Sequence, residues 1–114
     1  MPSIIEKILI EYVNGISKIV GNNLDKIILF GSYARNTQSQ NEEISDIDIM
    51  ILLNVEEDKI KDIEDKILDY SYDIDLKYNV LLSPIVETIN NYNTRITYMP
   101  FYQNVEKEGV VLSA

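Results

Sequence analysis

Residues 30–50, FGSYARNTQSQNEEISDIDIM, carry the pattern from which the rest of this sequence can be interpreted. They begin at the end of an apolar run, Ile27 to Phe30, that is typical of a strand and passes directly into a Gly-Ser pair. A second apolar run, from about Ile44 to Leu53, contains no helix signal, so we expect another strand there. Between the runs, Thr37 to Glu43 is polar and predicts a loop.

Two carboxylates, Asp46 and Asp48, lie two residues apart on the second expected strand. Side chains alternate between the faces of a strand, so both carboxylates share one face, about 6–7 Å apart along the strand. Ile47, Ile49 and Ile51 take the other face. Two like charges at this separation repel each other unless one carboxyl is protonated or a cation lies between them. Because Mg²⁺ suits two carboxylates completed by water and substrate phosphates, we expect a Mg²⁺ site here.

Gly31, Ser32 and Arg35 supply groups that suit an anionic ligand. Glycine permits a backbone that comes close to a ligand, and Ser32 can open a helix whose free N–H groups attract anions. Arg35 lies near the same helical face, where it can reach a phosphate oxygen or hold one of the carboxylates. Each feature alone is common in turns and on surfaces, but their order in so short a chain favours a site for a nucleoside triphosphate and a metal.

With these residues in place, the sequence resembles the DNA polymerase beta-like nucleotidyltransferase superfamily, and specifically its minimal single-domain members. The similar segments are GSYAR (31–35), SDIDIMIL (45–52) and, for a subgroup of these small proteins, the ending PFYQNVEKEGV (100–110). The resemblance implies an α+β fold, in which helices pack on one face of a small mixed β-sheet and the metal-binding aspartates lie on the other.

The resemblance also implies an activity and a partner. The activity is the Mg²⁺- and ATP-dependent transfer of a nucleoside monophosphate, with Gly31 and Ser32 at the triphosphate and Asp46 and Asp48 on the metals. Minimal members are often antitoxins of HEPN-domain ribonuclease toxins, so the implied partner is a HEPN toxin.

Residues from Tyr72 to Leu82 alternate between apolar and polar side chains, which predicts a third strand. The superfamily places a third carboxylate beside the first two on this strand, and the resemblance puts it where this sequence has Asn79. Asparagine can bind a metal through its carbonyl but cannot act as a base. Asp75 lies about 13 Å earlier along an ideal strand and would need a bulge or a change of register to replace it. We therefore expect Asn79, or alternatively Asp75, at the third catalytic position, with reduced transfer activity.

Composition narrows the possible partners. A chain of 114 residues is expected to form a single domain, 1–114, and its 10 basic and 19 acidic residues give a net charge of −9. This charge argues against nucleic acid and suits either a basic protein partner or solubility alone. The absence of Cys and His excludes disulfides, thiolate metal sites and a histidine base. We find no signal peptide or membrane span, so we expect a cytoplasmic protein without a membrane partner.

The remaining segments are mostly helical by their apolar spacing. A helix is expected from Ser3 to about Gly21, a second from Glu56 to Tyr70, a short one near Thr88 to Tyr92, and a last one that begins at Pro100 and ends at Gly109. The pair at residues 83–84, Ser-Pro, either ends the third strand or marks an edge strand that continues to Val86.

Three functions stay open. The first is an adenylyltransferase-type antitoxin that transfers AMP from ATP to a hydroxyl group of its partner toxin. The second is a catalytically weak homologue that neutralises the partner by binding alone. The third is a small-molecule nucleotidyltransferase, such as one that modifies an antibiotic, and the lack of room for a substrate-binding domain argues against it.

Overall fold

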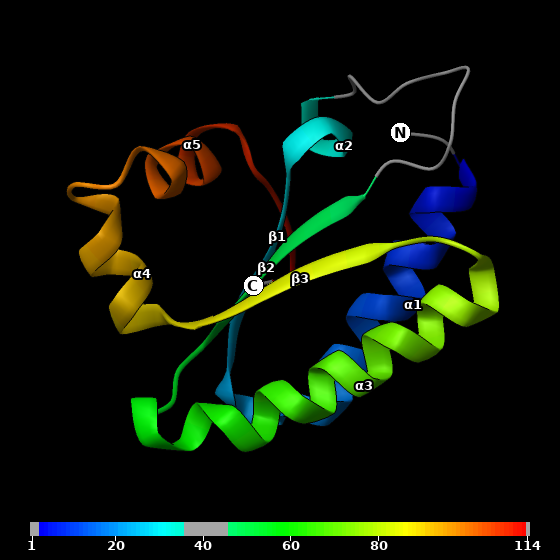
Figure 1. Cartoon of the computed structure of the whole chain (residues 1–114), viewed down its shortest axis with the longest axis horizontal. Coiled ribbons are helices and arrows are strands. Elements are labelled where there is room, and N and C mark those ends of the chain that lie inside the picture. Colours follow the sequence, from blue (N-terminus) through cyan, green and yellow to red (C-terminus); the bar gives the residue numbers. More distant parts are fainter. Residues whose placement is uncertain (1–2, 36–45, 114) are drawn as a thin grey trace.

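A computed structural model describes residues 3–35 and 46–113, so the expected loop at 37–43 lies outside the described residues. A four-stranded mixed sheet with the strand order β3-β2-β1-β4 forms the centre (Figure 1). The strands are β1 (Leu24–Phe30), β2 (Ile47–Leu53), β3 (Leu82–Thr88) and β4 (Val110–Ser113). β1 pairs antiparallel with β2 and with β4, whereas β2 and β3 are parallel. The predicted α+β class with a small mixed sheet is confirmed.

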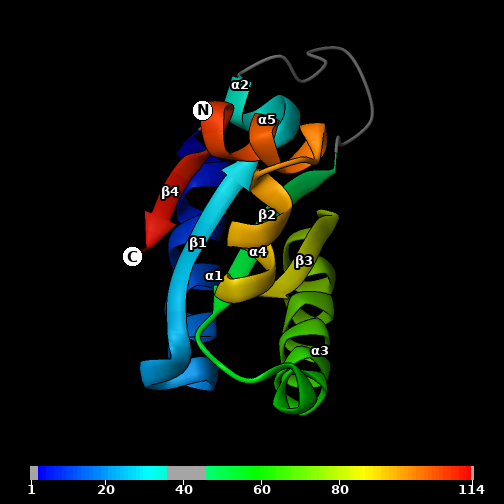
Figure 2. The same ribbon diagram turned by 90° about the vertical axis from the view of Figure 1, so that its left-hand side faces the viewer.

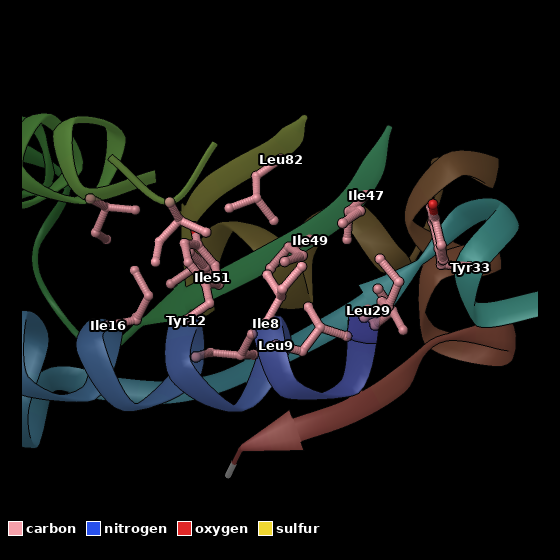
Figure 3. Close-up of a cluster of buried hydrophobic side chains, with 14 of the residues drawn as sticks. Ile8, Leu9, Tyr12, Ile16, Leu29, Tyr33, Ile47, Ile49, Ile51 and Leu82 are labelled. Atoms are coloured by element: carbon pink, nitrogen blue, oxygen red, sulfur yellow. The ribbon is translucent and has the colours of Figure 1, made fainter. Parts of the chain in front are cut away.

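Helices α1 (Ser3–Val20) and α3 (Ile60–Tyr78) cover one face of the sheet. Figure 3 shows Ile8, Tyr12 and Ile16 of α1 directed toward the sheet, where the isoleucines of β2 meet them. Ile47, Ile49 and Ile51 are fully buried in this cluster, because alternate residues of a strand point to the same face. The expected layer of helices on the isoleucine face is therefore formed by α1 and α3.

The opposite face carries a smaller second layer, α4 (Ile89–Ile96) and α5 (Pro100–Glu108). Figure 1 shows the sheet running between the two pairs of helices. Met50 and Leu52 pack on this side with Tyr92, Tyr102 and Val105. Asp48 belongs to the same face of β2 as Met50, since the two residues are separated by one position. Helices were expected on the isoleucine face of the sheet, and the structure has α4 and α5 on the aspartate face as well.

The prediction of a strand from Tyr72 to Leu82 is wrong. Helix α3 continues to Tyr78, and Asn79 ends it in the left-handed conformation with φ 54° and ψ 49°. Ile67, Ser71 and Ile74 are buried at helical spacing, whereas two apolar residues of the predicted alternation, Tyr72 and Leu76, are more than 60% exposed. Packing of α3 against α1 selects the helical periodicity, and the strand begins only at Leu82.

Several boundaries agree with expectation. α1 ends at Val20, α5 has proline in its first turn, and β3 is an edge strand that contains Pro84 and continues past Val86. Two short 3₁₀ turns, Gly21–Asn23 and Glu57–Lys59, precede β1 and α3. Strand β4 was not predicted, because four residues carry too little periodicity. Within residues 3–35 and 46–113, no helix is long and apolar enough to cross a membrane.

Candidate active site at the ends of β1 and β2

The site begins where β1 passes into the five-residue helix α2 (Gly31–Arg35). Phe30 at the end of β1 pairs with Asp48 of β2, so the next residue, Gly31, lies against the Asp48 side chain. Gly31 has φ +74°, a conformation that side-chain-bearing residues rarely adopt. A Cβ atom at this position would overlap with Oδ2 of Asp48. Glycine therefore permits both the turn and the close approach of the backbone to the carboxylate.

Asp46 and Asp48 form the expected carboxylate pair. Asp46 is exposed just before β2, and Asp48 is half-buried on the strand. Burial raises the pKa of the Asp48 carboxyl, the negative charge of Asp46 raises this pKa further, and the Arg35 guanidinium opposes both effects. A carboxylate that is costly to ionise and lies next to another carboxylate is stabilised by a bound cation.

The pair fits a magnesium ion by its chemistry, because carboxylate oxygens are ligands that Mg²⁺ prefers. Gly31 also allows the backbone to lie against the Asp48 carboxylate, where a side chain would overlap with it. In the part of the chain that the structure describes, no group of three or more His, Cys, Asp or Glu side chains is arranged to hold a metal. Asp46 and Asp48 would therefore be the protein ligands, and water and substrate phosphates would complete the coordination.

Arg35 lies at the end of α2 and connects it to α5. Its Nη1 atom is 3.8 Å from Oε2 of Glu108, and both side chains are about half exposed. Exposed ion pairs of this kind add little to stability and are readily exchanged. Arg35 can therefore turn from Glu108 to a phosphate group. Its guanidinium lies near Asp48, as its effect on the pKa of that carboxyl indicates.

A cleft of about 260 Å³ lies at this end of the sheet. One wall is formed by Phe30, Gly31, Arg35 and Asp48. The sequence had singled out the last three as candidate site residues. The other wall belongs to α5, which stands next to α2 in Figure 2, and consists of Phe101, Asn104, Val105 and Glu108. Sequence reasoning missed this second wall, although the resemblance of the segment 100–110 to a known ending was a signal for it.

Asp75 and Asn79 are not brought to the carboxylate pair. Oδ1 of Asp75, on α3, accepts a hydrogen bond of 2.8 Å from the backbone N–H of Leu82, so this carboxylate caps the start of β3. Asn79 is the exposed residue that ends α3. Helix α3 covers the isoleucine face of the sheet, whereas Asp48 points to the other face. The strand from Tyr72 to Leu82 that was expected to place Asn79 or Asp75 beside the pair does not form.

Ser83 occupies the position on β3 that lies beside the pair. It is the register partner of Asp48, and its Oγ donates a hydrogen bond of 3.3 Å to Oδ2 of Asp46. Sequence reasoning missed this role because it began the strand ten residues too early. Where a third carboxylate was expected, the structure thus has a hydroxyl group, which is neutral.

A larger groove of about 380 Å³ lies elsewhere, between α1 and β4. Its lining is mostly apolar and includes Leu9, Ile10, Val13 and Leu112. None of the glycine, arginine or aspartate residues of the site lines it. We therefore place the chemistry at the smaller cleft, where the groups suited to phosphate and metal converge.

Known proteins are similar to this chain in sequence. The family described as "Nucleotidyltransferase domain" matches residues 9–110. Two proteins of Methanocaldococcus jannaschii, named "Putative protein adenylyltransferase MJ0604" and "Putative protein adenylyltransferase MJ0141", are each 40% identical to the chain. The first alignment covers 94% of this chain and 96% of the relative, and the second covers 91% and 94%. The match spans both walls of the cleft and the carboxylate pair, and the chain belongs to the nucleotidyltransferase domain family.

Proposed function

We propose that the protein transfers AMP from Mg·ATP to a hydroxyl group of a protein partner. The observation that carries this proposal is the half-buried Asp48, whose pKa is raised beside Asp46 and whose side chain faces the backbone of Gly31. Such a site favours a cation, and the cleft that Gly31, Arg35 and Asp48 line offers room for a phosphate group beside it. The names of the curated relatives support a protein as the acceptor.

The reaction is a displacement at phosphorus. The acceptor oxygen forms a bond to the α-phosphorus of ATP, the bond from that phosphorus to the bridging oxygen breaks, and pyrophosphate leaves. Bound Mg²⁺ would neutralise phosphate charge and lower the pKa of the acceptor hydroxyl. Asp46 and Asp48 hold the metal, Gly31 and Ser32 border the triphosphate, and Arg35 neutralises a phosphate oxygen. The hydroxyl proton passes to water, since Ser83 is neutral where a third carboxylate was expected.

The partner that we propose is a HEPN-domain ribonuclease toxin, which the protein neutralises in the cytoplasm. This proposal is supported by the resemblance to minimal nucleotidyltransferases of toxin–antitoxin pairs. The net charge of −9 also suits association with a basic protein surface.

Binding of the nucleotide is tested by titration calorimetry with ATP, with and without Mg²⁺. The native protein is expected to bind ATP only when Mg²⁺ is present, and the double variant Asp46→Asn with Asp48→Asn to lose this binding. The matched control is Asp69→Asn with Asp73→Asn, which removes two exposed carboxylates from α3 and should bind normally. Equal binding of ATP without metal would contradict the proposal.

Transfer is tested by co-expression with a neighbouring HEPN-domain protein, followed by size-exclusion chromatography and intact mass measurement. A complex whose partner has gained the mass of one AMP supports transfer. A complex without added mass supports the second candidate, neutralisation by binding alone, which the neutral Ser83 beside the carboxylate pair favours. Two separate peaks at micromolar concentration would contradict both candidates.

A further inference from the structure

One face of helix α5 forms the second wall of the cleft. Phe101, Asn104, Val105 and Glu108 follow the spacing of residues that lie above one another on a helix surface. Val105 is buried against the second core cluster, whereas the other three residues are exposed. Glu108 is anionic and does not suit a phosphate group, which leaves an aromatic ring and an amide as the groups of this wall that suit a nucleoside.

The ring of Phe101 is held in place and yet accessible. It meets the Phe30 ring edge-to-face with the centroids 5.6 Å apart, and the Tyr102 ring with the centroids 5.3 Å apart. Despite these contacts, Phe101 remains 44% exposed. An aromatic ring that neighbours orient without covering it is suited to stack with a nucleic-acid base.

The amide of Asn104 lies one helical turn further along the same wall. Among residues 3–35 and 46–113, we find no hydrogen bond between this side chain and the protein. Its carbonyl and amino groups offer one acceptor and two donors in a plane. The same pair of groups matches the adjacent donor and acceptor of an adenine edge, as asparagine does in its contacts with adenine in DNA.

We propose that α5 provides the nucleoside half of the site, with Phe101 stacked on the base and Asn104 hydrogen-bonded to its edge in a way that selects adenine. The inference rests on the proposed function, because the phosphates at Gly31 and the metal at Asp48 fix one end of the ligand. The opposite wall of the same cleft is then where the nucleoside extends. A volume of about 260 Å³ is below the roughly 300 Å³ of most closed ligand pockets, which fits a nucleotide that lies partly in the open.

The experiment measures Mg²⁺-dependent binding of three ligands, ATP, GTP and inorganic tripolyphosphate, by calorimetry. Phe101→Leu should weaken the binding of ATP and GTP by about tenfold and leave tripolyphosphate unchanged, because only the nucleotides stack. Asn104→Asp replaces the amide donor by an acceptor and should lower the ratio of ATP to GTP affinity by about tenfold. Tyr98→Leu is the control, since Tyr98 is an exposed aromatic residue that does not line the cleft.

Each outcome decides the inference. If tripolyphosphate binds the native protein as tightly as ATP does, or if Asn104→Asp leaves the ATP to GTP ratio unchanged, the nucleoside site on α5 is refuted while the proposed function stands. Equal loss of all three ligands in Phe101→Leu would show a structural effect and would also count against stacking; Asn104→Asp, at an exposed position, still tests the base contact. If no ligand binds in the presence of Mg²⁺, the proposed function and the inference fail together.

Discussion

The backbone of Gly31 lies so close to Oδ2 of Asp48 that no side chain could be placed between them. The antiparallel pairing of Phe30 with Asp48 sets this approach, and the positive φ of Gly31 turns the chain away into α2 directly afterwards. One glycine thus meets two requirements, a left-handed turn and a close approach of the backbone to a carboxylate. Mutations can separate the free-energy cost of the positive φ from that of the overlap with Asp48.

Gly31→Ala is expected to destabilise the protein by more than Gly21→Ala. Gly21 also has a positive φ, +65°, but nothing lies within 4 Å of a Cβ atom there, so its substitution measures the cost of conformation alone, about 1–2 kcal/mol. At Gly31 the overlap with Asp48 adds to this cost. Urea unfolding of both variants gives the difference.

The double variant Gly31→Ala with Asp48→Ala removes the overlap while keeping the unfavourable φ. We expect the cost of Gly31→Ala in the Asp48→Ala background to fall to that of Gly21→Ala, with a coupling free energy of at least about 0.5 kcal/mol. Strictly additive effects would mean that the two residues do not interfere.

Asp48→Asn is expected to raise the melting temperature at neutral pH in the absence of Mg²⁺. The pKa of Asp48 is raised in the folded state by burial first and by Asp46 second, so ionisation of this group opposes folding above that pKa. Below the ordinary value of 3.8 the carboxyl is protonated in both the folded and unfolded states, and the advantage of the variant should vanish.

Calorimetric melting from about pH 3 to pH 8 checks this pH dependence. Binding of Mg²⁺ at the proposed site should stabilise the native protein and leave the stability of Asp48→Asn unchanged. Asp73→Asn, at an exposed position of α3, is the control for a lost negative charge. A variant less stable than the native protein across this range would contradict the assignment of Asp48 as a destabilising group.

Ser83→Asp is expected to strengthen Mg²⁺ binding by about tenfold or more, because a third carboxylate would join Asp46 and Asp48. If the proposed transfer occurs, its rate should also increase. Asn79→Asp should change neither quantity, since Asn79 ends α3 on the other side of the sheet. Mg²⁺ titration of both variants distinguishes them, and a gain confined to Asn79→Asp would restore the register that the sequence suggested.

Arg95→Met is expected to destabilise the protein clearly more than Lys61→Met does, because it removes the partner of a buried carboxylate. Nη1 of Arg95 donates to both carboxylate oxygens of Glu87, at 2.8 and 2.7 Å, and Glu87 is only 8% exposed. The Tyr102 hydroxyl donates to the same carboxylate, so this group joins α4 and α5 to β3. Without Arg95, the Glu87 charge is left buried with less compensation.

Urea unfolding measures this effect, and Lys61→Met provides the comparison. The ion pair of Lys61 with Asp65 has a similar separation, 3.0 Å, but both side chains are more than half exposed, so its loss should change stability little. Adding Glu87→Gln to Arg95→Met should recover part of the lost stability. If Arg95→Met and Lys61→Met destabilise the protein equally, burial of Glu87 does not strengthen the effect of losing its partner.

Local patterns were sufficient for the elements around the carboxylate pair. The alternation of Asp46, Ile47, Asp48 and Ile49 assigns opposite faces of a strand without any knowledge of the fold, because the geometry of an extended chain requires it. A glycine directly after the strand β1 and a proline before a helical pattern are likewise local signals, and the structure has both elements there. These features could be read from neighbouring residues alone.

Contacts between distant segments settled the remainder. The residues from Tyr72 onward satisfy a strand pattern as well as a helical one, and the choice depends on α1: Tyr12 and Ser71 share a buried hydrogen bond of 2.6 Å, and the Tyr12 and Tyr70 rings stack 5.7 Å apart. Pairing of β4 with β1 places Val110 beside Leu29, near the site, so that α5, which directly precedes β4, lies at the cleft. Periodicity indicates which side of a helix or strand is buried. Which residue faces Asp48 on the neighbouring strand or across the cleft depends on strand register and on the packing of α5, and both are set by the folded chain as a whole.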